Sequence, residues 1–127
     1  MQASLKTIII FCADVEKLVQ FYQQYFGLTI MGEANAHWTV LDAGAVQLAF
    51  HKIGEQFMPS STAEFKVQDS NVKLVFEIDT DLAAFRQTLL DKKVAMGDIK
   101  HFTGAAYIAC DGKDPEGNIF QLVQQLS

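Results

Sequence analysis

Residues 111–124, DGKDPEGNIFQLVQ, contain the clearest structural signal in the chain. Their centre, residues 114–118, has the composition of a tight turn, because proline fixes one φ angle while glycine and asparagine accept positive φ. The Asp114 carboxylate can accept hydrogen bonds from backbone amides further along the turn. We therefore expect a strand to begin directly after this turn, over residues 119–123.

Gln121 lies at the centre of this strand, IFQLV. Alternation places its side chain on the face opposite Phe120 and Leu122. A polar group in this position is either held by a hydrogen bond or lines a cavity. The sequence leaves both alternatives open.

The composition limits the class of protein. The 127 residues suffice for one domain with a modest core, and 50% of them are hydrophobic. A formal net charge of −5, without a cluster of Lys and Arg, argues against nucleic acid or an anionic membrane as partner. The sequence has no signal-peptide core and no apolar run of about 18 residues, so we expect a cytoplasmic protein.

Two cysteines, Cys12 and Cys110, lie far apart in the sequence and lack CxxC spacing. Buried, reduced thiols are the expected state, and a redox pair is the alternative. The sequence does not assign either cysteine a role.

The predicted elements occur in the same order twice. Asp14 is a good N-cap for a helix that ends at Gly27, and an acidic start at residues 79–81 precedes a second helix that closes near residues 92–93. The order β-α-β-β-β, repeated, predicts an α+β fold with helices on one face of its sheets. The predicted strands are residues 7–12, 28–32, 37–42, 45–51, 72–78, 94–99, 105–110 and 119–123. We expect module one at residues 1–56, a connecting loop at 57–71 and module two at 72–127.

Alternation along four strands separates an apolar face, packed on the helices, from a second face. Ala45 and Ala49 are small and leave room on this second face, so one interpretation is a polar-centred groove. The alternative is that this face is the solvated side of an ordinary antiparallel sheet. In either case we expect a weak surface pair between Lys73 and Glu77. The polar residues of the second face are Thr7, Gln47, His51, Lys73, Glu77 and Gln121.

Three segments together resemble the vicinal oxygen chelate superfamily, which includes glyoxalase I, extradiol dioxygenases and bleomycin resistance proteins. They are residues 13–22 (ADVEKLVQFY), 26–28 (FGL) and 114–122 (DPEGNIFQL). The resemblance spans essentially the whole chain. It implies two βαβββ modules that form curved mixed sheets around a pocket, commonly completed by the second subunit of a homodimer.

Enzymes of this superfamily hold a divalent metal with residues from the first and last strand of each module. The resemblance places these positions on Thr7, Gln47, Lys73 and Gln121. Threonine is a poor ligand, lysine is a cation without a lone pair, and two amide oxygens supply no charge. A tight site needs imidazole or deprotonated ligands, so we expect neither metal ligands nor catalytic residues here. An enzyme would need Gln47, Gln121, Glu77 and His51 in shifted roles.

The resemblance and these residues predict a metal-free protein of the bleomycin-resistance type, a homodimer that binds or sequesters an aromatic or planar, antibiotic-like small molecule. The alternatives are a divalent-metal-dependent lyase or dioxygenase, and a member of the family with an interaction role. Aromatic side chains would supply stacking area, and polar side chains would orient the ligand. The expected ligand-binding residues are Thr7, Phe11, Trp38, Gln47, His51, Phe57, Lys73, Glu77, Phe102, Tyr107 and Gln121.

Overall fold

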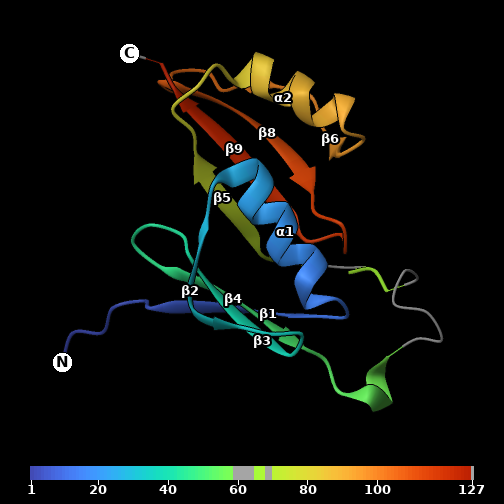
Figure 1. Ribbon diagram of the computed structural model, residues 1–127. Helices are drawn as coiled ribbons and strands as arrows, with labels where there is room; N and C mark the ends of the chain where they lie inside the picture. The colour runs from blue at the N-terminus through green and yellow to red at the C-terminus, as the bar shows by residue number, and fades with distance from the viewer. Residues whose placement is uncertain (59–64, 68–69, 127) are drawn as a thin grey trace. The chain divides into compact units, whose positions relative to one another are not determined.

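The computed structural model describes residues 1–58, 65–67 and 70–126 (Figure 1). The chain divides into two compact units, Met1–Lys66 and Val67–Ser127. Each unit contains a sheet and one α-helix. The predicted loop at residues 57–71 lies partly outside the described residues.

The first unit has the element order β-α-β-β-β. In its sheet the strand order is β1-β4-β3-β2, with β1 parallel to β4 and the other pairs antiparallel. A short 3-10 turn, η1 (Glu55–Phe57), follows the last strand and was not predicted. The elements are β1 (Thr7–Cys12), α1 (Val15–Phe26), β2 (Thr29–Ala34), β3 (Trp38–Asp42) and β4 (Gln47–Lys52).

The second unit repeats this order with one added short strand. Its sheet runs β5-β9-β8-β6, with β5 parallel to β9, and the added strand β7 pairs with β8. Both units are therefore βαβββ modules with mixed sheets, as the sequence predicted. The elements are β5 (Lys73–Glu77), α2 (Leu82–Asp91), β6 (Ala95–Met96), β7 (Lys100–His101), β8 (Tyr107–Lys113) and β9 (Ile119–Gln125).

Helix α1 begins and ends where the sequence predicts. The Asp14 carboxylate accepts a hydrogen bond from the Lys17 amide at 3.1 Å, which satisfies one of the open N–H groups of the first turn. Gly27 closes the helix in the left-handed conformation, with φ 68°. The Tyr22 ring stacks on Phe50 of β4, with centroids 5.5 Å apart, so the Leu48 and Phe50 face of the sheet is the one that packs on α1.

Helix α2 covers the corresponding face of the second sheet. Asp81 caps it through the Ala84 amide at 2.9 Å. The Leu82 amide donates to Gln124 Oε1 at 2.8 Å, and Gln124 shares its face of β9 with Phe120 and Leu122. In both units the apolar strand faces therefore lie against the helix, as alternation predicted. None of the helices in the described part of the chain is both long and apolar enough to cross a membrane.

The turn at residues 114–118 joins β8 to β9 and fixes their register. Asp114 Oδ1 accepts from the Glu116 and Asn118 amides at 2.9 Å each, and Oδ2 accepts from Asn118 Nδ2 at 2.9 Å. The Asp114 carbonyl accepts from the Gly117 amide at 3.0 Å, and Gly117 has φ 88°. Asp114 is only 5% exposed, so these bonds are protected from water. The predicted role of its carboxylate is confirmed.

Strand β8 runs three residues further than predicted, through Asp111, Gly112 and Lys113. The sequence DGK next to a turn motif is typical of a loop, so the strand was predicted to end at residue 110. This prediction was wrong. Gly112 lies in the strand because no side chain fits there: a Cβ would overlap the Phe120 ring and lie 2.6 Å from Met96 Sδ. Close packing, and not a positive φ angle, is therefore the reason that position 112 requires glycine.

We expect Asp114→Ala to lower the free energy of unfolding by about 2–3 kcal/mol, because the turn amides lose a charged acceptor. Urea denaturation at pH 7 measures this change. Asp79→Ala, which removes an exposed carboxylate, is the matched control and should change stability little. Equal effects of the two substitutions would contradict the role of the turn.

We also expect Gly112→Ala to destabilise the protein by about 1–3 kcal/mol, because the added methyl group must displace Phe120 or Met96. Gly97→Ala is its control, since a Cβ there would find its nearest neighbour, the Asp111 carbonyl oxygen, at an ordinary 3.6 Å. Thermal unfolding of the two variants compares them. A Gly112→Ala variant as stable as Gly97→Ala would show that the space around Phe120 adapts.

Candidate functional site

The sheet of the first unit has a polar pair on the face away from α1. Thr7 and Gln47 lie directly opposite each other in the parallel β1 and β4 pair. The Thr7 hydroxyl donates to Gln47 Oε1 at 3.2 Å. A recess of about 420 Å³ adjoins this pair and includes Met31, Asp42 and Gln47 in its lining.

Three predicted aromatic residues of the first unit also lie together on this face. His51 is opposite both Phe11 of β1 and Trp38 of β3. The His51 ring centroid is 5.3 Å from that of Phe11 and 5.8 Å from that of Trp38. Phe11 is 60% exposed, which is unusual for a phenylalanine on a sheet face.

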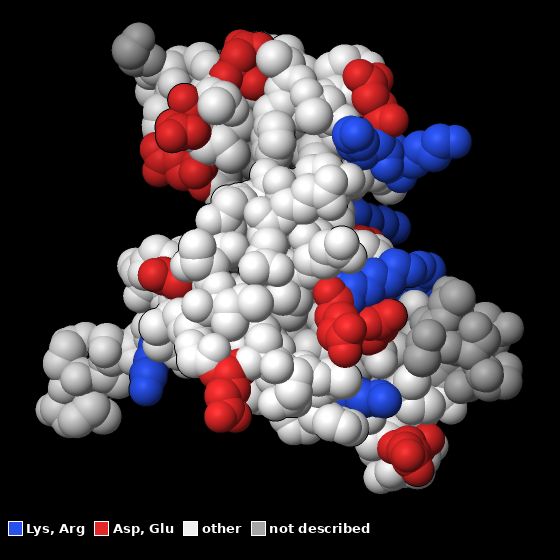
Figure 2. Space-filling view, viewed as in Figure 1, with Lys and Arg blue, Asp and Glu red and all other residues white. Residues whose placement is uncertain are grey.

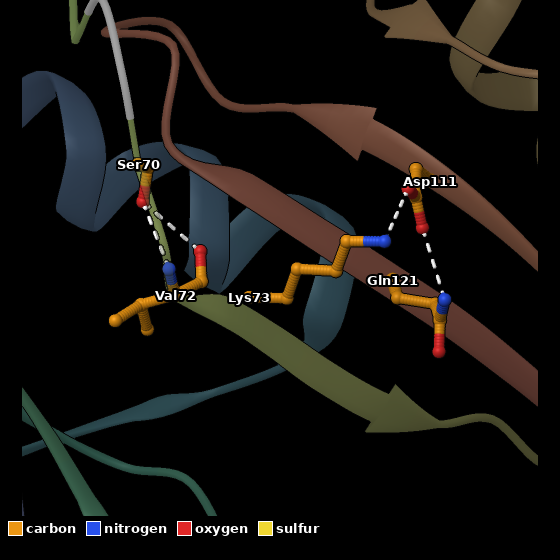
Figure 3. A network of polar contacts seen from close by, with 5 residues as sticks. All are labelled: Ser70, Val72, Lys73, Asp111 and Gln121. Atoms are coloured by element: carbon orange, nitrogen blue, oxygen red, sulfur yellow. Dashed lines mark hydrogen bonds and ion pairs between the residues drawn. The ribbon is translucent and has the colours of Figure 1, made fainter.

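In the second unit, Lys73 and Gln121 are joined by a residue that sequence reasoning missed. Lys73 Nζ contacts Asp111 Oδ2 at 2.7 Å, and Gln121 Nε2 donates to Asp111 Oδ1 at 3.0 Å. Figure 3 shows the three side chains pointing toward one another from β5, β8 and β9, with Gln121 Oε1 directed away from Asp111. We call Lys73, Asp111 and Gln121 the carboxylate bridge.

The predicted pairing of Lys73 with Glu77 is wrong. Residues four apart on a strand are separated by roughly 13 Å, so the two side chains share a face without meeting. Asp111 instead lies opposite Gln121 in the antiparallel β8 and β9 pair. The missed signal was the length of β8: once the strand includes residue 111, alternation places Asp111 on the same face as Gln121.

The bridge changes the acidity of Asp111. Partial burial raises the pKa of this carboxyl, but the hydrogen bonds from Lys73 and Gln121 and the charges of Lys73 and Lys100 outweigh burial and hold the pKa below its ordinary value. Asp111 therefore stays ionised at neutral pH. Its side chain is 32% exposed and that of Lys73 is 45% exposed, so the ion pair is partly screened by water.

A second recess adjoins the bridge. It has a volume of about 340 Å³, and its lining includes Asp111, Lys113 and Ile119 from the face away from α2. The backbone of Gly112 also contributes to it. A charged carboxylate, an ammonium group and apolar surface thus border one concave space within the second unit.

The remaining predicted residues lie outside these groups. Phe57 is in η1 and is 70% exposed, and Glu77 is exposed at the end of β5. Phe102 and Tyr107 contact each other, with ring centroids 5.5 Å apart, and are 42% and 37% exposed. Nine of the eleven predicted residues thus belong to one polar pair and one aromatic cluster in the first unit, and to the carboxylate bridge and one ring pair in the second, while Phe57 and Glu77 join none of these groups.

Both cysteines are buried thiols, as predicted. Burial raises the pKa of Cys110, the nearby Arg86 charge opposes this, and Asp111 adds to it. The net effect is a raised pKa, so the thiol is protonated at neutral pH. Cys110 therefore lacks the lowered pKa of a cysteine nucleophile.

The donor set does not fit a divalent metal ion. The Thr7 hydroxyl is bonded to Gln47, Lys73 is a cation held by Asp111, and the Gln121 amide donates to the same carboxylate. Divalent ions such as Zn²⁺, Ni²⁺ and Fe²⁺ prefer imidazole, thiolate or carboxylate ligands. Within residues 1–58, 65–67 and 70–126, no three His, Cys, Asp or Glu side chains are grouped so that they could hold a metal ion.

The surface carries side chains of both charges, in keeping with the 10 basic (Lys and Arg) and 15 acidic residues of the sequence. On the face drawn in Figure 2, Lys and Arg side chains alternate with Asp and Glu.

A profile of the Glyoxalase/Bleomycin resistance protein/Dioxygenase superfamily matches residues 4–122. The chain therefore belongs to this superfamily, and the predicted membership is confirmed. A comparison with curated proteins gave no match.

Solved structures with similar folds include proteins of different kinds. An integron cassette protein from the mobile metagenome of V. cholerae is 21% identical, with 98% of this chain and 97% of that chain covered and a TM-score of 0.70. A genomically encoded fosfomycin resistance protein from Listeria monocytogenes is 12% identical, with 98% and 94% covered and a TM-score of 0.75. A lactoylglutathione lyase from Agrobacterium tumefaciens is 12% identical, with 97% and 94% covered and a TM-score of 0.70. At these identities the likeness shows the shared fold alone.

We expect Asp111→Asn to lower the free energy of unfolding by about 1 kcal/mol at pH 7, because it removes the ion pair with Lys73. The folded-state pKa of Asp111 is lowered, so its stabilising contribution is present above the ordinary Asp pKa and is lost as pH falls through the folded value. The difference between wild type and variant should therefore stay nearly constant from pH 7 to about 5, and narrow as the pH falls from about 4 toward about 3.

Urea denaturation across this pH range measures the difference. Asp98→Asn is the control, because the Asp98 side chain is 99% exposed and contacts Arg86 only at 3.5 Å. A difference between wild type and Asp111→Asn that stays constant with pH would show that the carboxylate charge contributes nothing through the bridge.

Proposed function

We propose that this protein is a metal-free small-molecule binding protein of the bleomycin-resistance type, which sequesters an aromatic or planar ligand. The observation that carries the proposal is the carboxylate bridge. At two of the positions where the superfamily's enzymes hold a metal, Lys73 and Gln121 are already bonded to Asp111. A divalent cation there would have to displace an ammonium group from its partner.

The first unit supports the same proposal. Thr7 and Gln47, at the other two positions, form a neutral hydrogen bond next to a recess of about 420 Å³. Phe11, Trp38 and His51 supply exposed ring surface on the same sheet face. These rings are not among the residues that line the recess, so this sheet face offers a polar recess and, separately, aromatic surface on which a planar ligand can stack.

The proposal includes a homodimer and a cytoplasmic location. Exposed apolar side chains on the open sheet faces, Ile9 in the first unit and Val75 in the second, favour contact with another protein surface. The two buried thiols fit a reducing compartment. Light scattering of the purified protein measures the oligomeric state, and a monomer at micromolar concentration would contradict the dimer.

Metal analysis and thermal unfolding test the proposed function. We expect far less than one metal ion per chain in protein purified without chelator, and no rise in Tm with Zn²⁺, Ni²⁺, Mn²⁺ or Fe²⁺. In a panel of planar aromatic antibiotics, a ligand present at one hundred times its Kd should stabilise the folded state by about 2.7 kcal/mol. Stoichiometric metal that only a chelator removes, with lyase or dioxygenase activity, would overturn the proposal. A panel without any binder would also count against it.

We expect Phe11→Ala to weaken binding of such a ligand by about two- to tenfold, because one stacking surface is lost. Ile30→Ala is the matched control, since Ile30 is exposed in the same sheet but lies on its opposite face. Titration calorimetry with the best ligand of the panel measures both variants. Equal affinities of Phe11→Ala and wild type would remove Phe11 from the site.

A further inference from the structure

We infer that His51 Nε2 is the hydrogen-bond acceptor of a ligand site beside the Phe11 and Trp38 rings of the first unit, and that this site selects planar aromatic ligands carrying an N–H or O–H donor. The inference rests on the proposed function and deepens it. It names the ligand class and the atom that recognises it. All residues involved belong to β1, β3 and β4, which lie side by side in Figure 1.

The hydrogen bond of the other ring nitrogen sets the tautomer of His51. His51 Nδ1 lies 2.8 Å from the backbone carbonyl oxygen of Lys52. A carbonyl oxygen can only accept, so Nδ1 must carry the proton. In the neutral ring the lone pair is then on Nε2, and Nε2 becomes an acceptor.

The position of Nε2 leaves this acceptor available. Nε2 lies across the ring from the nitrogen that faces the Lys52 carbonyl, and His51 is exposed. Among the described residues, none forms a hydrogen bond with Nε2. A ligand donor can therefore bind there without displacing a protein group.

Two aromatic rings flank the imidazole and define the shape of the ligand. Phe11 is tilted by 50° against the His51 ring and is 60% exposed, so much of its surface is open. Trp38 meets His51 edge to face, at 78°, on the other side. The two ring contacts and the hydrogen bond of Nδ1 favour one orientation of the imidazole, and hence one direction of its acceptor. A flat ligand gains stacking area on Phe11 while its N–H or O–H group bonds to Nε2.

Indole and 1-methylindole test this inference, because they differ in the single N–H donor. We expect the wild type to bind indole about two- to tenfold more tightly than 1-methylindole, as one hydrogen bond allows. His51→Phe keeps an aromatic ring between Phe11 and Trp38 but removes the acceptor. This variant should bind both compounds equally. Titration calorimetry measures the four affinities.

His101→Phe is the matched control, because it replaces an exposed histidine in the second unit. It should keep the preference for indole. Circular dichroism and thermal unfolding show whether His51→Phe is folded. If it is not, His51→Gln serves in its place, and in the wild type the ¹⁵N resonance of His51 Nε2 should shift with indole but not with 1-methylindole. The variants His37→Gln and His101→Gln assign that resonance, since the chain has 3 histidines.

Two results would overturn the inference. A preference for indole that persists in His51→Phe would show that another group accepts the hydrogen bond. Equal or undetectable binding of the two compounds by the wild type would show that no donor is selected. If the wild type shows no preference for indole but planar aromatic compounds still raise its Tm, the proposed function stands while this inference fails.

Discussion

The bonds of Asp114 within its own turn are the constraint on which the second unit depends. One carboxylate holds two backbone amides and the Asn118 side chain, so the chain reverses over five residues with Lys113 and Ile119 in register. That register places Asp111 opposite Gln121, and Gln121 beside β5, from which Lys73 reaches Asp111. The polar chemistry of this sheet face thus follows from a turn that takes no part in it.

The first unit reaches a similar arrangement by a different route. Its parallel pair β1 and β4 sets Thr7 directly against Gln47, and their hydrogen bond is neutral. In the second unit the parallel pair β5 and β9 places Lys73 level with Ile119, so the lysine needs its long side chain to reach a partner two strands away. The same topology therefore carries a neutral pair in one unit and a charged bridge in the other.

Alternation and capping residues predicted most of the fold, because these signals are local. The Asp14 cap, the Gly27 stop and the division of four strands into two faces were confirmed, since burial against a helix leaves a period-two pattern. The bridge was not predicted, because it depends on β8 continuing through Gly112. A single sequence does not show whether a glycine is required by close packing, as Gly112 is against the Phe120 ring, or by the backbone conformation of a turn. The pairing of Lys73 with Glu77 failed because that spacing suits a helix, not a strand.

Gly112 also bears on how this protein can be engineered. Its neighbours Asp111 and Lys113 border the recess of the second unit, so they are natural positions to randomise when a new specificity is sought. A library that varies the glycine between them would contain many destabilised clones, because even a methyl group there meets the Phe120 ring. Diversification around this space should skip every second residue of β8, leaving the inward-facing positions as they are.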